Sequence, residues 1–394
     1  MEVVRWTLIE NGSVCHTFRK QTRMEFQSLY EDAVSLLKQL IATPSFSKQE
    51  EKTAVLIRTF LHNKDIPAKQ YLNNIWATNK YYDPLKPTVL LNSHHDTVKP
   101  NPKYTRSPFV PEVEEGKLFG LGSNDAGGCL VSLIATFVYF YDKADLDFNV
   151  VLAATAEEEI TGKNGIEALL VHYDFLASLH HPDFKAAQHQ FTAIVGEPTK
   201  MELAIAEKGL MVLDAKAQGR AGHAARNEGE NAIYIALKDI EWFGTFQYPE
   251  KSPWLGEVHQ TVTVVETENK AHNVVPAECS FVVDIRIPDC YTHEQILDII
   301  KENIKSDFKE RSIRLRSTRI EVDHPVVEAG IKLGGKPYGS PTCSDKALMP
   351  FPALKCGPGD SARSHTADEF IYVDEIKQGI ERYIKMLEST QFVR

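Results

Sequence analysis

Short apolar runs separated by helix-like segments constrain the fold of this chain more than any other feature. Three of these runs are predicted to be buried strands: Val89–Leu91, Phe148–Thr155 and Phe191–Val195. Between the first two lies Cys129–Phe140, which is apolar on all sides, and the preceding Gly127-Gly128 favours a loop that leads into a buried helix. Strands that alternate with helices predict an α/β fold with a mixed, largely parallel sheet between helices.

Two further helices are predicted near the ends of this α/β layer. Residues 26–41 carry apolar side chains at helical spacing, and Pro44 marks the end of that helix. The apolar positions are Leu29, Ala33, Leu36, Leu37 and Leu40. The closing helix carries the same type of apolar face at Ile376, Ile380, Tyr383, Ile384 and Leu387.

The middle of the chain has a different pattern, which predicts a second domain inserted into the first. Strands at 210–218, 260–265, 281–287 and 313–322 alternate with helices at 231–243 and from Thr292 onward, where Thr292 and Gln295 have capping-box spacing. The resulting order β-α-β-β-α-β is that of a ferredoxin-like unit. We therefore expect a catalytic domain in two parts, 24–206 and 322–394, with an inserted domain at 207–321. Residues 1–23 are expected to be a disordered or non-native extension, with Met24 as an alternative start.

The charge and the cysteine content limit which partners and which cellular compartment are expected. The chain has 44 Lys and Arg against 54 Asp and Glu, a net charge of -10, and no apolar run of the roughly 20 residues that cross a membrane. A nucleic-acid or membrane partner is therefore not expected, because both require a basic surface. The six cysteines are scattered and form no C-x-x-C pair, and the first residues lack a signal-peptide core. These features predict a cytoplasmic protein with reduced thiols.

The residues that follow each predicted strand are the strongest functional signal. The first strand leads into His94 and Asp96, the second into Glu157-Glu158-Glu159, and the third into Glu197. Sites in open α/β sheets lie at the carboxyl ends of the strands, so these side chains are predicted to share one edge. Two loops extend the set, one with Asp125 and one with His365. Histidines and carboxylates together form a zinc-type ligand set.

Each of these motifs alone has an ordinary structural explanation. An H-x-D triplet such as His94-x-Asp96 is often a surface feature, although on extended backbone Asp96 could orient the His94 ring while His95 points away. A run of three glutamates is usually a solvated turn, yet here it ends a strand, where a dication would offset the repulsion. The polar loop with His180, His181 and His189 is interpreted as surface.

Taken in order, these motifs resemble those of the metal-dependent amidohydrolases that include acetylornithine deacetylase, succinyl-diaminopimelate desuccinylase, aminoacylase and related carboxypeptidases. The resemblance extends over nearly the whole chain from about Met24. It implies a zinc-exopeptidase-like catalytic domain and an inserted domain that acts as a lid and in dimerisation. The motifs that carry it are His94-x-Asp96, GSNDAGG at Gly122–Gly128, TAEEE at Thr155–Glu159, GEPT at Gly196–Thr199, Gly222-His223, N-x-V-P at Asn273–Pro276, D-x-R at Asp284–Arg286, and His365 in SHTADE.

The resemblance implies two Zn²⁺ ions per subunit, for which Co²⁺ can substitute. His94, Asp125 and Glu197 would bind one ion, and Asp125, Glu159 and His365 the other. The peptide after the shared Asp125 would be cis. Glu158 would be the general base. Asp96 would orient the ring of the ligand His94 without binding a metal ion itself. The triple glutamate leaves the register open by one residue, and we place the base at Glu158.

The inserted domain would supply the other site residues. His223 would stabilise the oxyanion and reach the metal centre of a partner subunit, while Asn273 and Arg286 would bind the substrate's carboxylate. The sequence departs from the family pattern at Ala126, where a lysine is usual, and after His223, where Ala224-Ala225 replace a serine and proline. Neither change removes a ligand or the base.

Within this family the chain is most similar to acetylornithine deacetylase. This implies hydrolysis of N2-acetyl-L-ornithine to L-ornithine and acetate, in arginine biosynthesis, by a homodimer. N-acetylcitrulline, N-succinylornithine, N-acyl-lysine and dipeptides stay open as substrates, because small changes in a pocket switch such preferences. An alternative of another class is a non-catalytic, metal-binding dimeric homologue, which would have no need of an acid at Glu158.

Overall fold

The computed structural model describes residues 26–180, 190–226 and 228–392, which fall into two compact units. The first consists of the described parts of Met1–Leu203, Pro325–Lys336 and Lys355–Arg394, and the second of Ala204–His324 and Pro337–Leu354. The expected inserted domain, 207–321, falls within the second unit. Residues 1–23, Met24, His181 and His189, which the sequence analysis discussed, lie outside the described residues.

The first unit contains a sheet with strand order β1-β2-β6-β3-β7. Its strands are β1 (Lys69–Tyr71), β2 (Asn74–Thr78), β6 (Asn149–Thr155), β3 (Thr88–His94) and β7 (Phe191–Val195). The central strand β3 runs parallel to β6 and β7, whereas β2 runs antiparallel to β6. All three of the predicted strands are present, and each is buried throughout. The predicted α/β class is confirmed.

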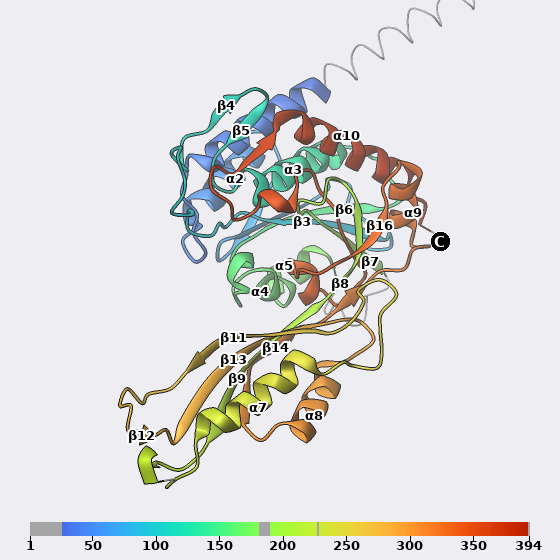
Figure 1. Ribbon diagram of the computed structural model, residues 1–394. Helices are drawn as coiled ribbons and strands as arrows, with labels where there is room; N and C mark the ends of the chain where they lie inside the picture. The colour runs from blue at the N-terminus through green and yellow to red at the C-terminus, as the bar shows by residue number, and fades with distance from the viewer. Residues whose placement is uncertain (1–25, 181–189, 227, 393–394) are drawn as a thin grey trace, which may run out of the picture. The chain divides into compact units, whose positions relative to one another are not determined.

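Helices cover both faces of this sheet (Figure 1). The buried helix α3 (Gly128–Tyr141) and the closing helix α10 (Val373–Ser389) lie on one face, and the short helices α4 (Ile166–Leu170) and α5 (Tyr173–Ser178) lie on the other. Residues 26–41 are helical, as predicted, and all five of the apolar side chains expected on their inner face are buried. The unit also contains α2 (Glu51–His62), α9 (Pro325–Lys332) and a small sheet of β4 (Glu112–Glu114), β5 (Lys117–Phe119) and β18 (Phe370–Tyr372).

The second unit is built around a four-stranded antiparallel sheet with the order β11-β13-β9-β14. The strands are β9 (Gly209–Gln218), β11 (His259–Glu266), β13 (Glu278–Ile287) and β14 (Asp307–Leu315). Two helices, α7 (Ala232–Thr245) and α8 (His293–Asn303), supply apolar side chains to the core on one face of the sheet. The predicted element order β-α-β-β-α-β and the capping box of Thr292 and Gln295 are confirmed.

In the part of the chain that the structure describes, six further strands, none of them in this four-stranded sheet, lie wholly or mainly in the second unit. They are β8 (Leu203–Glu207), β10 (Gly222–His223), β12 (Val274–Val275), β15 (Thr318–Arg319), β16 (Pro337–Ser340) and β17 (Ala353–Lys355). The segment from Pro337 belongs here because β16 pairs with β8. The predicted strand at 313–322 was wrong in its limits, since β14 ends at Leu315. β14 is an edge strand with many exposed charged side chains, so its apolar pattern is weak.

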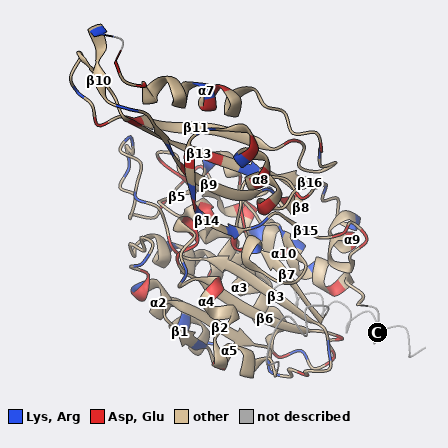
Figure 2. Ribbon diagram, turned by 90° about the horizontal axis from the view of Figure 1, so that it is seen from below, with Lys and Arg blue, Asp and Glu red and all other residues tan. Residues whose placement is uncertain are grey.

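Charged positions of both signs are interspersed over the elements of each unit (Figure 2). Among the described residues, no helix combines the length and the apolarity that crossing a lipid bilayer requires.

Candidate metal centre

The parallel strands of the first unit bring their carboxyl ends to one edge of the sheet. β3 ends at His94, which lies opposite Thr155 at the end of β6. The glutamates at 157–159 begin two residues after the end of β6, and Glu197 comes two residues after β7. We call the side chains that meet at this edge the strand-end cluster: His94, Asp96, Asp125, Glu158, Glu159, Glu197 and His365. As expected, these side chains lie close together, as the distances between their nitrogen and oxygen atoms show.

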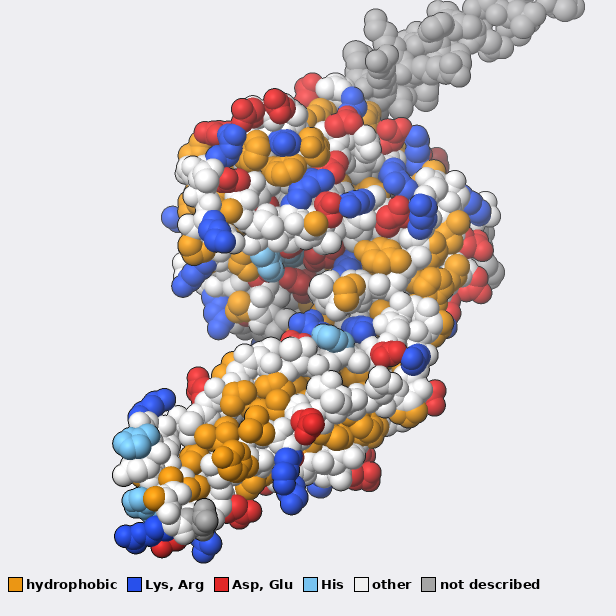
Figure 3. All heavy atoms as spheres, viewed as in Figure 1, with side chains coloured by type: hydrophobic (Ala, Val, Ile, Leu, Met, Phe, Trp, Pro, Cys, Tyr) orange, Lys and Arg blue, Asp and Glu red, His pale blue; other side chains and the backbone are white. Residues whose placement is uncertain are grey.

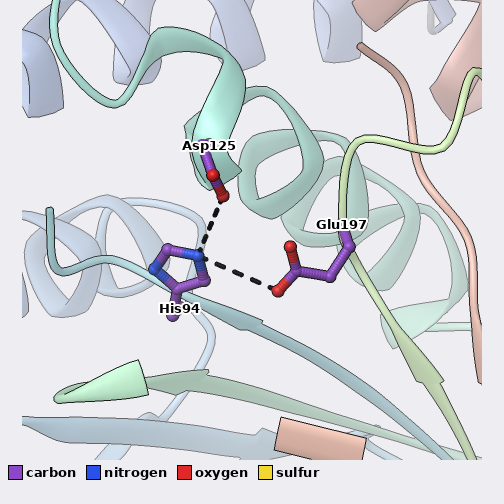
Figure 4. Close-up of side chains that lie close together, drawn as sticks. All are labelled: His94, Asp125 and Glu197. Carbon is purple, nitrogen blue, oxygen red and sulfur yellow. Dashed lines mark ion pairs between the residues drawn. The ribbon is translucent and has the colours of Figure 1, made fainter. Parts of the chain in front are cut away.

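The first group in the cluster is centred on the buried Nε2 atom of His94 (Figure 4). This atom lies 3.4 Å from Oδ1 of Asp125 and 3.9 Å from Oε1 of Glu197. The other ring nitrogen, Nδ1, lies 3.0 Å from the backbone oxygen of Asp96. Nδ1 thus fixes the ring orientation, and Nε2 faces the two carboxylates.

The second group uses the other oxygen of the same aspartate. Oδ2 of Asp125 lies 3.5 Å from Nε2 of His365, which is 3.0 Å from Oε2 of Glu159. The ligand atoms of Asp125, Glu159 and His365 all lie within 4.8 Å of one another, as do those of the first group. Asp125 is therefore shared between the groups and offers a different oxygen to each.

A tight turn, η1 (Ser123–Gly127), positions Asp125 at the start of α3. The preceding Gly122 has a φ of 74°, and a Cβ atom there would lie 2.6 Å from Cγ2 of Thr97, so the turn requires glycine. The peptide bond Asp125-Ala126 is cis, and this prediction is confirmed.

Asp96 connects the first histidine to the turn of glutamates. Its carboxylate accepts hydrogen bonds from the backbone amides of Glu158 and Glu159, at 3.1 and 3.2 Å, and from the Ser47 hydroxyl at 2.7 Å. Burial opposes ionisation of Asp96, but the contacts with His94 and Ser47 outweigh it and lower the pKa of this carboxyl. Asp96 is thus a charged support beneath the cluster.

The three consecutive glutamates point in different directions. The Glu157 side chain is buried and accepts hydrogen bonds from Asn164. Oε2 of Glu158 lies 3.9 Å from Nε2 of His94, and Glu159 contacts His365. This arrangement agrees with the register that places the base at Glu158 and a ligand at Glu159.

His95 shows what a purely structural histidine looks like at this edge. Its Nδ1 atom lies 2.8 Å from the Thr53 hydroxyl and its Nε2 atom 2.9 Å from the backbone oxygen of Asn73. Burial lowers the pKa of His95 to about 4. The neighbouring histidines therefore differ: both nitrogens of His95 are paired, and the ring points away from the cluster, as predicted.

The electrostatics of the cluster favour a bound cation. Burial lowers the pKa of His94, but the nearby carboxylates of Asp125 and Asp96 outweigh it and hold this pKa well above its ordinary value. The hydrogen bond to Glu159 raises the pKa of His365 to about 9. In Figure 3, acidic and histidine side chains gather in a recess on the face of the first unit that is shown. The surrounding carboxylates that retain protons on these rings would equally attract metal ions.

The donor set fits a pair of divalent metal ions. Nε2 of His94 is buried and has no hydrogen-bond partner among the described residues, which is the state of a ring nitrogen prepared for a metal. Each group offers one imidazole and two carboxylates, a combination that Zn²⁺ accepts in sites that keep an open position. The residues present therefore fit two ions that share Asp125.

The three site residues expected from the inserted domain lie in the second unit, in two places. His223 and Asn273 are exposed and adjacent, since His223 pairs with Val274 and the Ala224 amide donates to the backbone oxygen of Asn273. We call this pair of short strands, β10 and β12 with Asn273, the distal ribbon. Arg286 lies near the opposite end of β13, where its guanidinium donates to both oxygens of Asp284 at 2.8 and 3.0 Å.

The length of β13 separates these two places. The ribbon adjoins the Glu278 end of β13, because Gly219 donates to the backbone oxygen of Ala277. Arg286 is eight residues further along this extended strand, or roughly 25 Å at about 3.3 Å per residue. In one copy of the unit, Asn273 and Arg286 therefore cannot hold the same carboxylate.

A comparison with protein families decides the classification. Residues 90–389 match the family described as Peptidase family M20/M25/M40. The chain belongs to this family. It is a metal-dependent hydrolase of the peptidase and amidohydrolase type.

Several curated relatives of this M20 chain have different named substrates. It is 27% identical to an acetylornithine deacetylase of Proteus mirabilis, over 90% of this chain and 96% of the relative. It is 25% identical to a succinyl-diaminopimelate desuccinylase of Ruegeria sp., over 70% of each chain. It is also 25% identical to a [LysW]-lysine/[LysW]-ornithine hydrolase of Saccharolobus islandicus, over 76% of this chain and 81% of the relative.

Two solved structures have a similar fold. The aminopeptidase PepT of Bacillus cereus aligns with a TM-score of 0.72 at 18% identity, over 91% of this chain and 98% of the other. The YXEP protein of Bacillus subtilis, described as a dinuclear metal binding peptidase, aligns with a TM-score of 0.67 at 14% identity, over 92% and 98%.

The structure of this M20 chain also shows polar contacts that the sequence analysis missed. Ser47 donates to Asp96, and the buried Glu369 accepts hydrogen bonds from the turn that carries Asp125. Glu369 lies in the SHTADE motif, so its position was visible, but nothing in the spacing indicated a role. A carboxylate that binds backbone amides has no characteristic sequence partner.

Proposed function

We propose that this chain hydrolyses the amide bond of an N-acyl amino acid, with N2-acetyl-L-ornithine as the first substrate to test. The proposal rests on the different positions of the carboxylates relative to the two proposed metal ions. Asp125 is shared by two metal-type groups, whereas Glu158 lies beside them without belonging to either. A site that only held metal would not require this extra acid.

Zinc is the metal we propose, with His94, Asp125 and Glu197 around one ion and Asp125, Glu159 and His365 around the other. When bound, the two ions would polarise the scissile carbonyl and lower the pKa of the attacking water. Support comes from the donor types and from the related YXEP protein, described as dinuclear. Co²⁺ is expected to substitute.

In this proposal a side chain of the protein transfers the proton of the attacking water. Glu158 would take it from the attacking water and deliver it to the nitrogen of the leaving amine, so that one carboxylate acts first as base and then as acid. Asp96 holds the backbone amides of Glu158 and Glu159 and so fixes the direction of both side chains. The carbonyl oxygen gains negative charge during attack, and His223 would donate a hydrogen bond to it.

We choose acetylornithine because of the share of each chain that aligns with the relatives. The Proteus mirabilis deacetylase aligns over more of both chains than the desuccinylase or the LysW hydrolase does. N-acetylcitrulline, N-succinylornithine, N-acyl-lysine and dipeptides would require the same chemistry, so they belong in the same assay. With acetylornithine as substrate, the reaction would serve arginine biosynthesis, and the scattered cysteines favour the cytoplasm as its compartment.

We further propose a homodimer in which the ribbon of one subunit completes the site of the other. The separation along β13 supports this, because His223 and Asn273 cannot reach a small substrate held by Arg286 of the same unit. The second unit also offers a surface for pairing. β11 is an edge strand with exposed Val264 and Val265, and the adjacent helix α7 exposes Tyr234 and Leu237. Apolar side chains of this kind gather on the visible face of the second unit in Figure 3.

The test is a panel of N-acyl amino acids and dipeptides, followed by release of the free amine, with and without a metal chelator. We expect chelator-sensitive release from acetylornithine, and a Glu158→Gln chain as control should release the amine about 10²- to 10⁴-fold more slowly. Faster release from another member of the panel would replace acetylornithine as substrate. Release that is unaffected by complete metal removal would contradict the proposed chemistry.

A further inference from the structure

The carboxylate of Glu369 is buried against the turn that carries Asp125. Only 2% of this residue is exposed. Its Oε1 atom accepts hydrogen bonds from the backbone amides of Asn124, at 2.8 Å, and Asp125, at 2.9 Å, and its Oε2 atom accepts one from Gly122 at 3.1 Å. Three amides of one turn thus converge on one side chain.

The backbone of Glu369 is itself held in place. Its carbonyl oxygen accepts a hydrogen bond from Gly120, and the next residue, Phe370, pairs with Phe119 in the small sheet of β18 and β5. The side chain therefore projects from a fixed strand end into the turn. Rotation of the turn would break these three hydrogen bonds at a site that is almost closed to water.

The same segment carries the histidine of the second group. His365 precedes Glu369 by four residues, so this short segment contributes one proposed ligand and holds the backbone of another. Asn124 adds a second connection, since its side chain exchanges hydrogen bonds with the backbone of Asp360 at 3.0 Å in each direction. The two loops that meet at Asp125 are thus joined from both sides.

We propose that Glu369 is a positioning residue for Asp125: by fixing the turn it sets where the two oxygens of the shared ligand lie, and hence the affinity of the second metal ion. The inference rests on the proposed two-metal centre. It does not make Glu369 a ligand, because its oxygens are occupied by backbone amides. Hydrogen-bond partners that hold metal ligands typically contribute about 10- to 100-fold to metal affinity.

The variant Glu369→Gln tests this with little change of shape. The glutamine side chain keeps one acceptor oxygen. Its NH₂ group replaces the other oxygen, so at least one backbone N–H of the turn would lose its acceptor. Asp368→Asn is a matched control, because Asp368 is the adjacent residue and its carboxylate accepts hydrogen bonds from the backbone amides of Thr105 and Arg106, at 2.9 Å each, instead of from the turn that carries Asp125. CoCl₂ is titrated into each metal-stripped full-length chain and followed by visible absorption and calorimetry.

We expect Glu369→Gln to bind the second Co²⁺ about 10- to 100-fold more weakly than wild type, with the wild-type absorption spectrum restored at high CoCl₂. Asp368→Asn should bind like wild type. Equal affinities in Glu369→Gln and wild type would overturn the proposal, and so would an equal loss in both variants.

Two further measurements cover the case in which Glu369→Gln does not fold. Glu369→Asp keeps the carboxyl group but shortens the side chain, and it should show the same loss of Co²⁺ affinity. In the metal-free wild-type chain, the amides of Gly122, Asn124 and Asp125 should exchange slowly with solvent deuterium, and fast exchange would overturn the proposal. If wild type binds two Co²⁺ ions but hydrolyses none of the panel, the proposed function fails while this comparison of variants still stands.

Discussion

The strand-end cluster and the distal ribbon both carry residues expected at the active site, but they are built in opposite ways. In the cluster, the His94 side chain is 1% exposed, and backbone amides or fixed carbonyls orient both Asp96 and the His94 ring. In the ribbon, His223 and Asn273 are exposed, and the His223 ring accepts a hydrogen bond from the nearby Ala225 amide. The cluster is preorganised within one unit, whereas the ribbon displays its side chains to solvent.

This difference indicates which half of the chemistry each region supports. Metal ions and a proton carrier must be held at fixed separations, and the buried His94 and Asp96, which are held by backbone atoms, provide rigidity in the cluster. A group that stabilises the oxyanion has to approach after substrate has bound, and an exposed ribbon is free to do so. The account thus predicts that changes in the cluster and in the ribbon have different signatures in metal content and turnover.

The largest expected effect is the loss of turnover in Glu158→Gln without loss of metal. The amide keeps the shape of the side chain but cannot carry a proton, so kcat should fall by about 10²- to 10⁴-fold. Metal analysis of the purified chain should still find two ions. The matched variant Glu159→Gln should instead lose metal from the second group. If the two variants exchange these behaviours, the register of the glutamates is shifted by one residue.

The next effect is expected in the ribbon. His223→Ala should lower kcat by about 10²- to 10³-fold, as removal of one oxyanion donor does, and should leave metal content unchanged. The exposed neighbour His272 provides the control, since His272→Ala alters the same end of the unit without removing the proposed donor. A His223→Ala chain that loses metal would place this histidine among the ligands and would remove the distinction between the two regions.

A smaller effect should appear in substrate binding when Arg286 is changed. Arg286→Lys keeps the charge but loses the planar fork, so KM should rise by roughly 10- to 100-fold while the metal content is retained. Arg311→Lys is the control, because Arg311 forms a similar fork with Asp214 on the same sheet. An unchanged KM in Arg286→Lys would show that Arg286 does not bind substrate and that its role is limited to the ion pair with Asp284.

The smallest effect on turnover is expected from His95, which should influence stability instead. The folded-state pKa of about 4 lies below the ordinary 6.5, so the unfolded chain takes up the proton first as the pH falls. Between pH 6 and pH 4, wild type should therefore lose about 1–3 kcal/mol more of its free energy of unfolding than His95→Gln does. Urea unfolding in the presence of a chelator measures this, with His62→Gln as a surface control. Equal pH dependence in wild type and His95→Gln would show that His95 is not buried in its neutral form.

The sequence predicted the cluster better than the ribbon for a physical reason. Parallel strands end at one edge of a sheet, so His94 and Glu197 could be brought together from strand order alone. The position of Arg286 relative to Asn273 depends on the uninterrupted length and register of β13, which residue types do not determine. Glu369 and Ser47 escaped notice because they bind backbone amides or another side chain without a recurring spacing.

The strand β14 shows the same limit in the fold. Its exposed charges suit an edge strand, and its pairing with β9 includes register shifts, so the apolar pattern located the strand several residues too late. By contrast, β9 and β13 alternate buried and less buried side chains along ten residues each, which made their positions readable.

The most direct test of the central claim, that the cluster of one chain works with the ribbon of another, is a mixing experiment. Inactive His223→Ala and Glu158→Gln chains are mixed in equal amounts under conditions of proven subunit exchange, and acetylornithine hydrolysis is measured. In each mixed dimer one site would carry both changes and the other neither, so about a quarter of wild-type activity should return. No recovery, despite exchange, would contradict the account and place His223 in its own subunit's site or outside catalysis.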